Sequence, residues 1–205
     1  MNVTNIVLAG VGGQGILLAA EILGSAAVKG GYNVRVSELH GMAQRGGAVV
    51  THVRVGDKAF ASTILDGTAD VIVGFEPMET LRNIRYASQE TMIIMNTNPY
   101  KICGAKYPGV EEIIDKTRFF TKKLVQINAL TLSEKAGASV TQNVVMLGAL
   151  AATGKLQLEI SHINGVLKEL VPKRFLDVNL RAFDLGYKET QARIPRIDCE
   201  QLANR

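Results

Sequence analysis

The chain begins with a short run of apolar residues, 5–9, that a glycine-rich turn ends, and such a run is typical of a buried strand. Residues 14–29 follow with apolar side chains nearly all round a helix, so we expect a well-buried helix that the glycine pair at 30–31 ends. Residues 32–38 then alternate between polar and apolar, which predicts a second strand. This opening is a β-α-β unit, and its parallel strands should carry functional loops at their carboxyl ends.

The next stretch departs from the usual nucleotide-binding half. Residues 49–55 alternate as in a strand, with His52 and Arg54 on the other face from the valines. The pair Gly56-Asp57 is typical of a two-residue hairpin turn with glycine in the first central position. We therefore expect a β-hairpin, and not a crossover helix, after the second strand, and consequently a mixed sheet.

Strands and helices alternate again in the rest of the chain. Strands are predicted at 70–75, 91–95 and 122–128. Helices are predicted from Glu76-Pro77, with proline in the first turn; from the capping box Thr131-x-x-Glu134 to Gly137; at 142–153, capped by Thr141; at 162–170, capped by Ser161 and ended by Pro172; and at 174–188. The pattern predicts an α/β fold: three α/β/α layers with a mixed, mostly parallel sheet and a Rossmann-like start that a β-hairpin interrupts.

Length and composition favour one domain over residues 1–205, with a polar tail at about 190–205. Its apolar runs are far shorter than the roughly 20 residues that span a bilayer, and no secretory signal is visible, so we expect no membrane association. There are only two cysteines, Cys103 and Cys199, and no C-x-x-C. The chain cannot by itself make a four-cysteine zinc or iron–sulfur site, and a cytoplasmic location fits best.

Charge gives a weaker indication, because the net charge is only +4. Basic residues are scattered except for the group Lys116, Arg118, Lys122 and Lys123. With no tryptophan and 5% aromatic residues, the chain has little to stack on single-stranded nucleic acid. A solvated or partner-facing surface is favoured over a nucleic-acid groove.

The glycine turn has two interpretations. Gly10, Gly12 and Gly15 form G-x-G-x-x-G, whose N–H groups at a helix start could bind a phosphate. Glu38 stands near the place of a ribose-binding acidic residue, which would suit a stand-alone NAD(P)-dependent enzyme. The expected hairpin argues against that enzyme. The alternative is close packing of strand on helix, with Gln14 capping the turn or directed at a neighbour, with or without a bound anion.

A second loop, residues 39–47, is expected beside the glycine turn. Glu38, His40, Gln44 and Arg45 cluster there next to Gly46-Gly47. Paired glycines let a backbone come close to a ligand or to another chain, and an arginine can hold a carboxylate or phosphate bidentately. We favour a functional or interface role for this loop, and a regulatory site for an anionic metabolite is one form of that role. The alternative is an ordinary polar loop in which Arg45 forms a salt bridge.

Residues of a complete active site are poorly represented. None of the three histidines, His40, His52 and His162, has a metal-ligand companion three or four residues on, and His52 is favoured as a strand-face residue. Cys103 is a lone cysteine in a turn, which is far more often inert than nucleophilic. There is no nucleophile elbow and no G-x-x-x-x-G-K-[ST] phosphate loop. We assign no catalytic and no metal-binding residue, and interpret the chain as a binding platform.

Several motifs together resemble one family. They are "GVGGQG" from Gly10, "LLAAEILG", "SELHGMAQRGGAVV", "GFEPMETLR", "TQNVVMLGAL" and "PKRFLDVNLRAFDLGY". The chain is similar over about residues 4–188 to the small (gamma-type) subunit of 2-oxoacid:ferredoxin oxidoreductases, and most similar to the beta subunit of the indolepyruvate type.

The resemblance implies a subunit of a larger complex that is inactive alone. The complex would decarboxylate an aryl 2-oxoacid oxidatively to an acyl-coenzyme A and pass electrons to ferredoxin. Thiamine diphosphate, Mg²⁺ and the iron–sulfur clusters would belong to the large subunit, and this chain alone would bind none of them. The residues expected to face the partner near its cofactor and coenzyme A are Gly10, Gly12, Gly13, Gln14, Gly15, Glu38, Gln44, Arg45, Gly46 and Gly47. In isolation such a subunit could self-associate through these loops.

Overall fold

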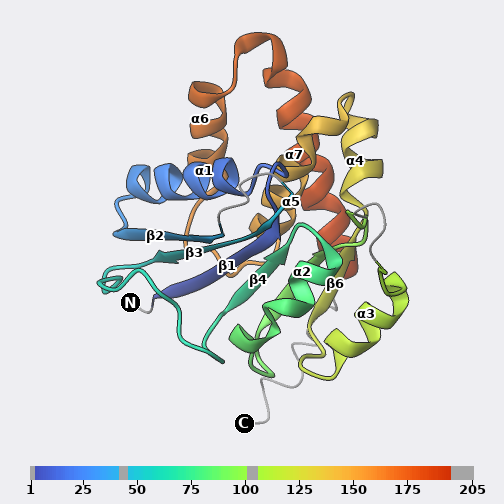
Figure 1. The fold of residues 1–205 in the computed structure, drawn as a ribbon. Coiled ribbons are helices and arrows are strands. Elements are labelled where there is room, and N and C mark those ends of the chain that lie inside the picture. Colours follow the sequence, from blue (N-terminus) through green and yellow to red (C-terminus); the bar gives the residue numbers. More distant parts are fainter. Residues whose placement is uncertain (1–2, 42–45, 101–105, 195–205) are drawn as a thin grey trace, which may run out of the picture.

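A computed structural model describes residues 3–41, 46–100 and 106–194 of the chain. Six strands form one sheet in the order β2-β3-β1-β4-β5-β6 (Figure 1). The strands are β1 (Thr4–Val11), β2 (Val34–His40), β3 (Ala48–Val55), β4 (Val71–Gly74), β5 (Met92–Asn96) and β6 (Leu124–Ile127). The helices are α1 (Ile16–Lys29), α2 (Pro77–Arg82), α3 (Val110–Arg118), α4 (Ala129–Ala136), α5 (Gln142–Ala151), α6 (Ile160–Leu170) and α7 (Lys173–Arg193), with 3-10 turns η1 (Ile84–Tyr86) and η2 (Ser139–Thr141).

Successive residues of the central strands point to opposite faces, and each face has its own core. Ile6 and Leu8 of β1 pack on the side of α1, α5, α6 and α7, in the larger cluster. Val7 between them packs on the other side with Tyr86, and Met95 of β5 packs with α3. Apolar side chains are therefore buried on both faces of the sheet, and the predicted three-layer α/β fold is confirmed (Figure 1).

The sheet is mixed, as predicted, but the antiparallel strands are arranged differently from the prediction. β1, β4, β5 and β6 pair in parallel, while β3 lies between β1 and β2 and is antiparallel to both. The hairpin expected at Gly56-Asp57 is wrong, because no strand follows until β4. β3 pairs instead with β2, the strand that precedes it. Residues 59–70 bury only Ala59, Ile64 and Ala69, and so lack the alternating pattern of a strand.

Two expected helix starts and one expected side-chain cap are also corrected. Asn128, not Thr131, caps α4, since its side chain accepts a hydrogen bond from the Thr131 N–H at 3.0 Å. The Thr141 hydroxyl donates to the carbonyl of Ala138 at 2.8 Å and does not cap α5. α6 begins at Ile160, so Ser161 lies inside it. α4 and α6 thus begin earlier than predicted, whereas α5 begins at Gln142, as predicted.

The carboxyl-terminal helix is longer than predicted. α7 continues to Arg193 with Thr190 fully buried, so the first residues of the expected polar tail are helical. Residues 195–205 of that tail lie outside the described residues. In the described part of the chain, no helix combines the length and the apolar character needed to cross a membrane.

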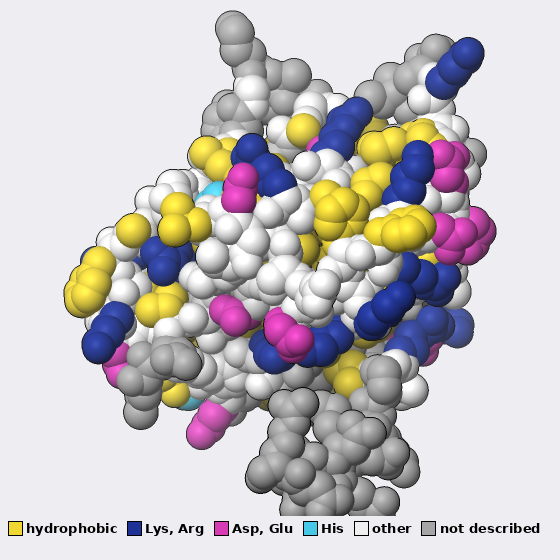
Figure 2. Space-filling model, turned by 90° about the horizontal axis from the view of Figure 1, so that it is seen from below, with side chains coloured by type: hydrophobic (Ala, Val, Ile, Leu, Met, Phe, Trp, Pro, Cys, Tyr) yellow, Lys and Arg dark blue, Asp and Glu magenta, His cyan; other side chains and the backbone are white. Residues whose placement is uncertain are grey.

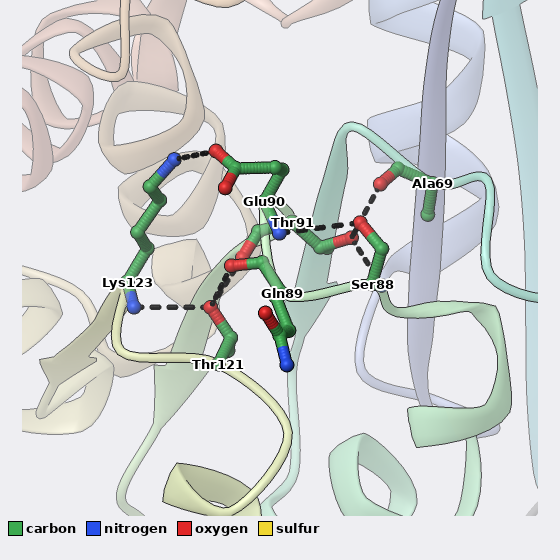
Figure 3. A network of polar contacts seen from close by, with 7 residues as sticks. All are labelled: Ala69, Ser88, Gln89, Glu90, Thr91, Thr121 and Lys123. Carbon is green, nitrogen blue, oxygen red and sulfur yellow. Dashed lines mark hydrogen bonds and ion pairs between the residues drawn. The ribbon is translucent and has the colours of Figure 1, made fainter.

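The amino ends of β4, β5 and β6 are joined by a network of polar contacts (Figure 3). The Thr91 hydroxyl donates to the carbonyl of Ala69 at 2.6 Å. The Thr121 hydroxyl donates to the carbonyl of Thr91 at 2.8 Å and accepts from the Lys123 N–H at 3.0 Å. Two buried threonines thus hold these strand starts together, at the end of the sheet away from the glycine turn.

Candidate functional site

The glycine turn and the second loop lie side by side at the carboxyl end of β1. The Gly12 N–H donates to the carbonyl of Gly47 at 2.8 Å, and the Gly46 N–H donates to the carbonyl of Gly12 at 3.1 Å. Two reciprocal backbone hydrogen bonds therefore join the loops, and the prediction that the second loop lies beside the glycine turn is confirmed. Gln44 and Arg45 lie outside the described residues, so the part played by their side chains stays a prediction.

Gln14 ties the glycine turn to the end of β4. Its Oε1 accepts from the Val11 N–H at 2.8 Å, and its Nε2 donates to the carbonyl of Phe75 at 3.1 Å. Both ends of the amide are used inside the fold, which confirms the expectation that Gln14 caps the turn or binds a neighbour. A Cβ on Gly10 would lie 2.7 Å from Gln14 Oε1, so glycine is required there for this packing.

Asn96 extends the same connection to β5. Its Nδ2 donates to the Phe75 carbonyl at 3.0 Å, and its Oδ1 accepts from the N–H groups of Asn98 and Ala129, each at 3.1 Å. The carboxyl ends of β1, β4 and β5 and the start of α4 thus share one set of hydrogen bonds. Sequence analysis did not single out Asn96, although the "NTNPY" turn that it opens was visible.

A cleft of about 770 Å³ opens beside this set of hydrogen bonds. Its lining comes from the glycine turn, the ends of β4 and β5, the start of α5, and the α6–α7 junction; the residues are Gly12–Gly15, Leu18, Phe75, Asn96, Asn98, Pro99, Tyr100, Ala138–Asn143, Met146, Leu170, Val171, Pro172, Phe175, Val178 and Asn179. No Asp, Glu, Lys, Arg or His is among these described residues. The cleft is therefore walled by apolar and neutral polar groups.

Large apolar side chains stand exposed around the cleft. Five of the residues that line it have substantially exposed hydrophobic side chains: Leu18, Tyr100, Val140, Leu170 and Phe175. Val140, at 85%, is the most exposed of them. We call these five residues the apolar rim. Exposed apolar side chains gathered around one cleft are typical of a surface that binds another molecule.

Glu38 does not lie in this cleft. It is exposed on β2 and lines a separate, shallow depression with residues of α1 and with Glu169. β3 lies between β1 and β2, so Glu38 is two strand spacings, about 4.8 Å each, away from the strand that carries the glycine turn. The structure thus separates Glu38 from the glycine turn, which a nicotinamide-binding site would need side by side.

A buried carboxylate that sequence analysis missed supports one wall of the cleft. Glu76 is 1% exposed; its Oε2 accepts from the Glu79 N–H at 2.9 Å, and its Oε1 accepts from the Tyr100 N–H at 3.3 Å and from the Tyr107 hydroxyl. Burial raises the pKa of Tyr107 well above its usual range, and the bond to Glu76 raises it further. Burial also raises the pKa of Glu79, and the charge of Arg82 acts in the opposite direction and lowers it. Glu76 thus holds both Tyr100, on the rim, and Tyr107.

His52 lies on a strand face, as predicted, and that face proves to be buried. It is buried on β3, and its Nδ1 accepts from the Ile64 N–H at 3.1 Å. Its ring meets that of Tyr86 edge-on, with centroids 4.8 Å apart. Burial lowers the pKa of His52, and the charge of Arg85 lowers it further. Within the described ranges, no three His, Cys, Asp or Glu side chains gather in a way that could hold a metal ion.

Most of the basic group at 116–123 is neutralised locally. Lys116 pairs with Glu112 at 2.6 Å, Arg118 with Asp115 at 3.2 Å, and Lys123 with Glu90 at 2.5 Å. On the face seen from below, Lys and Arg side chains likewise lie among acidic and hydrophobic ones (Figure 2). Exposed pairs of this kind contribute little to stability, about 0–1 kcal/mol each.

Comparison with known proteins identifies the family. A family model described as pyruvate ferredoxin/flavodoxin oxidoreductase matches residues 5–189. Indolepyruvate oxidoreductase subunit IorB of Pyrococcus horikoshii is 44% identical over 192 residues, which cover 90% of this chain and 94% of that protein. The pyruvate/ketoisovalerate oxidoreductases common subunit gamma of Pyrococcus furiosus is 30% identical over 186 residues, covering 89% and 94%.

A solved structure has the same fold. Pyruvate oxidoreductase subunit PORC of Thermotoga maritima aligns with a TM-score of 0.71 at 24% identity, covering 92% of this chain and 97% of that one. The residues that the family model matches include the glycine turn, the second loop and the elements that form the cleft. This chain therefore belongs to the pyruvate ferredoxin/flavodoxin oxidoreductase family.

Proposed function

We propose that this chain is the small subunit of a 2-oxoacid:ferredoxin oxidoreductase that acts on an aryl 2-oxoacid of the indolepyruvate type. Its 44% identity to an indolepyruvate oxidoreductase subunit, against 30% to a pyruvate/ketoisovalerate one, supports that substrate class. The complete enzyme would convert the oxoacid and coenzyme A to an acyl-coenzyme A and CO₂. The two electrons released would reduce two ferredoxin molecules in the cytoplasm.

In this proposal the large subunit holds thiamine diphosphate, Mg²⁺ and the iron–sulfur clusters. The donor set supports this division, since a cluster takes about four cysteines and this chain has two, Cys103 and Cys199. Both cysteines lie outside the described residues. The small subunit would contribute binding surface, and the large subunit would contribute the reacting groups.

The apolar rim is the observation that carries the docking proposal. Leu18, Tyr100, Val140, Leu170 and Phe175 surround the cleft next to the two joined glycine loops. Protein interfaces have apolar, often aromatic, centres that lack charged residues, and the cleft wall has that composition. The large subunit would cover this face, with the backbone of Gly12, Gly13, Gly46 and Gly47 close to the entry of coenzyme A.

Co-expression tests the proposal. The chain purified with the large subunit should reduce ferredoxin with indolepyruvate and coenzyme A, and neither subunit should do so alone. Val140→Lys and Phe175→Lys would place charges in the proposed interface and should weaken assembly by about tenfold or more. Phe119→Lys is a matched control, because Phe119 is 87% exposed and does not line the cleft.

Two results would contradict this assignment. One is a large subunit that reduces ferredoxin fully without this chain. The other is assembly that the two rim substitutions leave unchanged. The alternative of a stand-alone NAD(P) enzyme has lost its support from Glu38, and calorimetry with NAD and NADP provides the direct comparison.

A further inference from the structure

Two helices begin at the cleft beside the glycine turn. Gly13 and Gly15 line it just before α1, and Gln142 and Asn143 line it in the first turn of α5. Neither helix has a side-chain cap, and neither has an acidic residue in its first turn. The first N–H groups of a helix and the positive end of its dipole are normally matched by a cap or a negative group. No described side chain supplies that match here.

Asn143 provides a second and independent indication of a ligand. It is 6% exposed and lines the cleft, and its side-chain amide has no hydrogen-bond partner among the described residues. A Cβ on Gly15 would lie 2.7 Å from Asn143 Nδ2, so the amide lies against the glycine turn. Buried side-chain amides are nearly always hydrogen-bonded. The Asn143 amide faces the cleft without a partner on the described chain, so it is free to bond to a ligand or to water there.

The chemistry of the wall limits what that partner can be. Because the described lining has no Lys, Arg or His, a bound anion would be held by N–H groups and amides rather than by a cation. Such donors suit a compact oxyanion. Phe175, Met146 and Leu170 supply an apolar wall in the same cleft, which can take an apolar body attached to the anion. The volume of about 770 Å³ suits a small molecule.

We infer that Asn143 and the amino-terminal turns of α1 and α5 form a binding site for the oxyanion, phosphate or carboxylate, of a small ligand with an apolar body. This inference extends the proposed function. It depends on that proposal in one respect only, namely that a large subunit would close over the cleft. The ligand would therefore lie between the two subunits.

Titration calorimetry of the full chain, alone and in complex with the large subunit, tests the site with three probes of similar shape. Phenyl phosphate and phenylacetate carry the two oxyanions, and benzyl alcohol is neutral. At least one anion should bind about tenfold more tightly than benzyl alcohol. The preferred anion then identifies the group: a phosphate if phenyl phosphate binds better, and a carboxylate if phenylacetate does.

Asn143→Asp is the decisive variant, because it changes charge and not shape. The helix dipole would offset part of the cost in stability of placing a carboxylate at this largely buried position, and repulsion should weaken anion binding by about tenfold or more. A residue with only a structural role would not separate these two readouts. Asn143→Leu should also lose anion binding. Asn164→Leu is the control, because Asn164 Oδ1 is buried without a partner among the described residues and Asn164 does not line the cleft.

Three results would overturn the site: no binding of either anion by chain or complex, equal binding of benzyl alcohol, or unchanged anion affinity in Asn143→Asp. Each of these would leave ferredoxin reduction by the assembled complex intact. Failure of the site can therefore be distinguished from failure of the proposed function.

Discussion

Gly148 of α5 lies directly against the backbone of Phe183 in α7, such that a Cβ at position 148 would be 2.0 Å from the Phe183 carbonyl oxygen. The contact is reciprocal, because a Cβ on Gly186 would lie 2.0 Å from the carbonyl oxygen of Val145. The two helices therefore cross with their backbones in contact. This crossing fixes the two helices that supply Asn143 and Phe175 to the cleft.

Gly148→Ala should be severely destabilising. The added methyl group meets backbone and not a flexible side chain, so α5 and α7 must separate, at a cost of about 3 kcal/mol or more in the free energy of unfolding. Gly165→Ala in α6 is the matched control, since nothing lies within 4 Å of its Cβ position. That substitution should gain about 0.5–1 kcal/mol. Urea unfolding of both variants gives the comparison, and a Gly148→Ala protein as stable as the wild type would refute the close crossing.

Gln14→Leu should loosen the glycine turn. It removes the acceptor of the Val11 N–H, while the Phe75 carbonyl keeps its bond from Asn96. One unsatisfied buried donor predicts a loss of about 1–3 kcal/mol in stability and weaker assembly with the large subunit. Gln191→Leu, on the exposed side of α7, should change stability by less than about 0.5 kcal/mol. Equal effects of the two substitutions on unfolding would contradict the role of Gln14.

The sequence allowed most of the fold to be predicted where apolar periodicity was strong. The strands around residues 5–9, 70–75 and 91–95 and the helix after the glycine turn are confirmed. The position of β3 could not be predicted, because alternation in residues 49–55 defines a strand and not its neighbours. α3 was not anticipated, since only Ile113, Ile114 and Thr117 of its nine residues are buried.

For the candidate site, local motifs gave the two loops but not the cleft. The glycine turn and the Gly46-Gly47 pair could be recognised because glycines mark the places where a chain turns between elements. Asn143, Phe175 and Glu76 come from separate regions of the chain, and only tertiary packing brings the first two into one cleft and Glu76 behind its wall. Glu38 was expected near the glycine turn from its spacing along the chain, which does not give the order of the strands in the sheet. In the structure β3 lies between β1 and β2, so Glu38 is separated from the turn.

His52 should make the protein less stable in mild acid. Its pKa is lowered in the folded chain, so the unfolded state takes up a proton first as the pH falls below 6.5, its usual value. Protonation at Nδ1 would also break the bond from the Ile64 N–H. The stability that His52 contributes is full above that pH and declines below it, by at most about 1.4 kcal/mol per pH unit.

His52→Gln isolates this term, because glutamine keeps an acceptor for Ile64 and does not titrate. The free energy of unfolding, measured by urea at several pH values from neutral to mildly acidic, should fall less steeply in the variant. Glu79 acts in the opposite sense, since its raised pKa favours the folded state as pH falls, and it is common to both proteins. Parallel curves for the two proteins would show that His52 does not titrate differently on folding.

Thr121→Val should cost more stability than loss of the ion pair drawn beside it (Figure 3). Valine has the same shape, but it leaves the carbonyl of Thr91 and the N–H of Lys123 without their partner, which predicts a loss of about 1–3 kcal/mol. Glu90→Gln removes the exposed pair with Lys123 and should cost less than about 1 kcal/mol. Because the network lies at the amino ends of the strands, neither substitution should alter assembly or ferredoxin reduction at temperatures where both variants are folded. Urea unfolding together with activity measurements on both variants tests these points. A larger loss of stability in Glu90→Gln than in Thr121→Val would contradict the prediction that the buried hydroxyl contributes more than the surface ion pair.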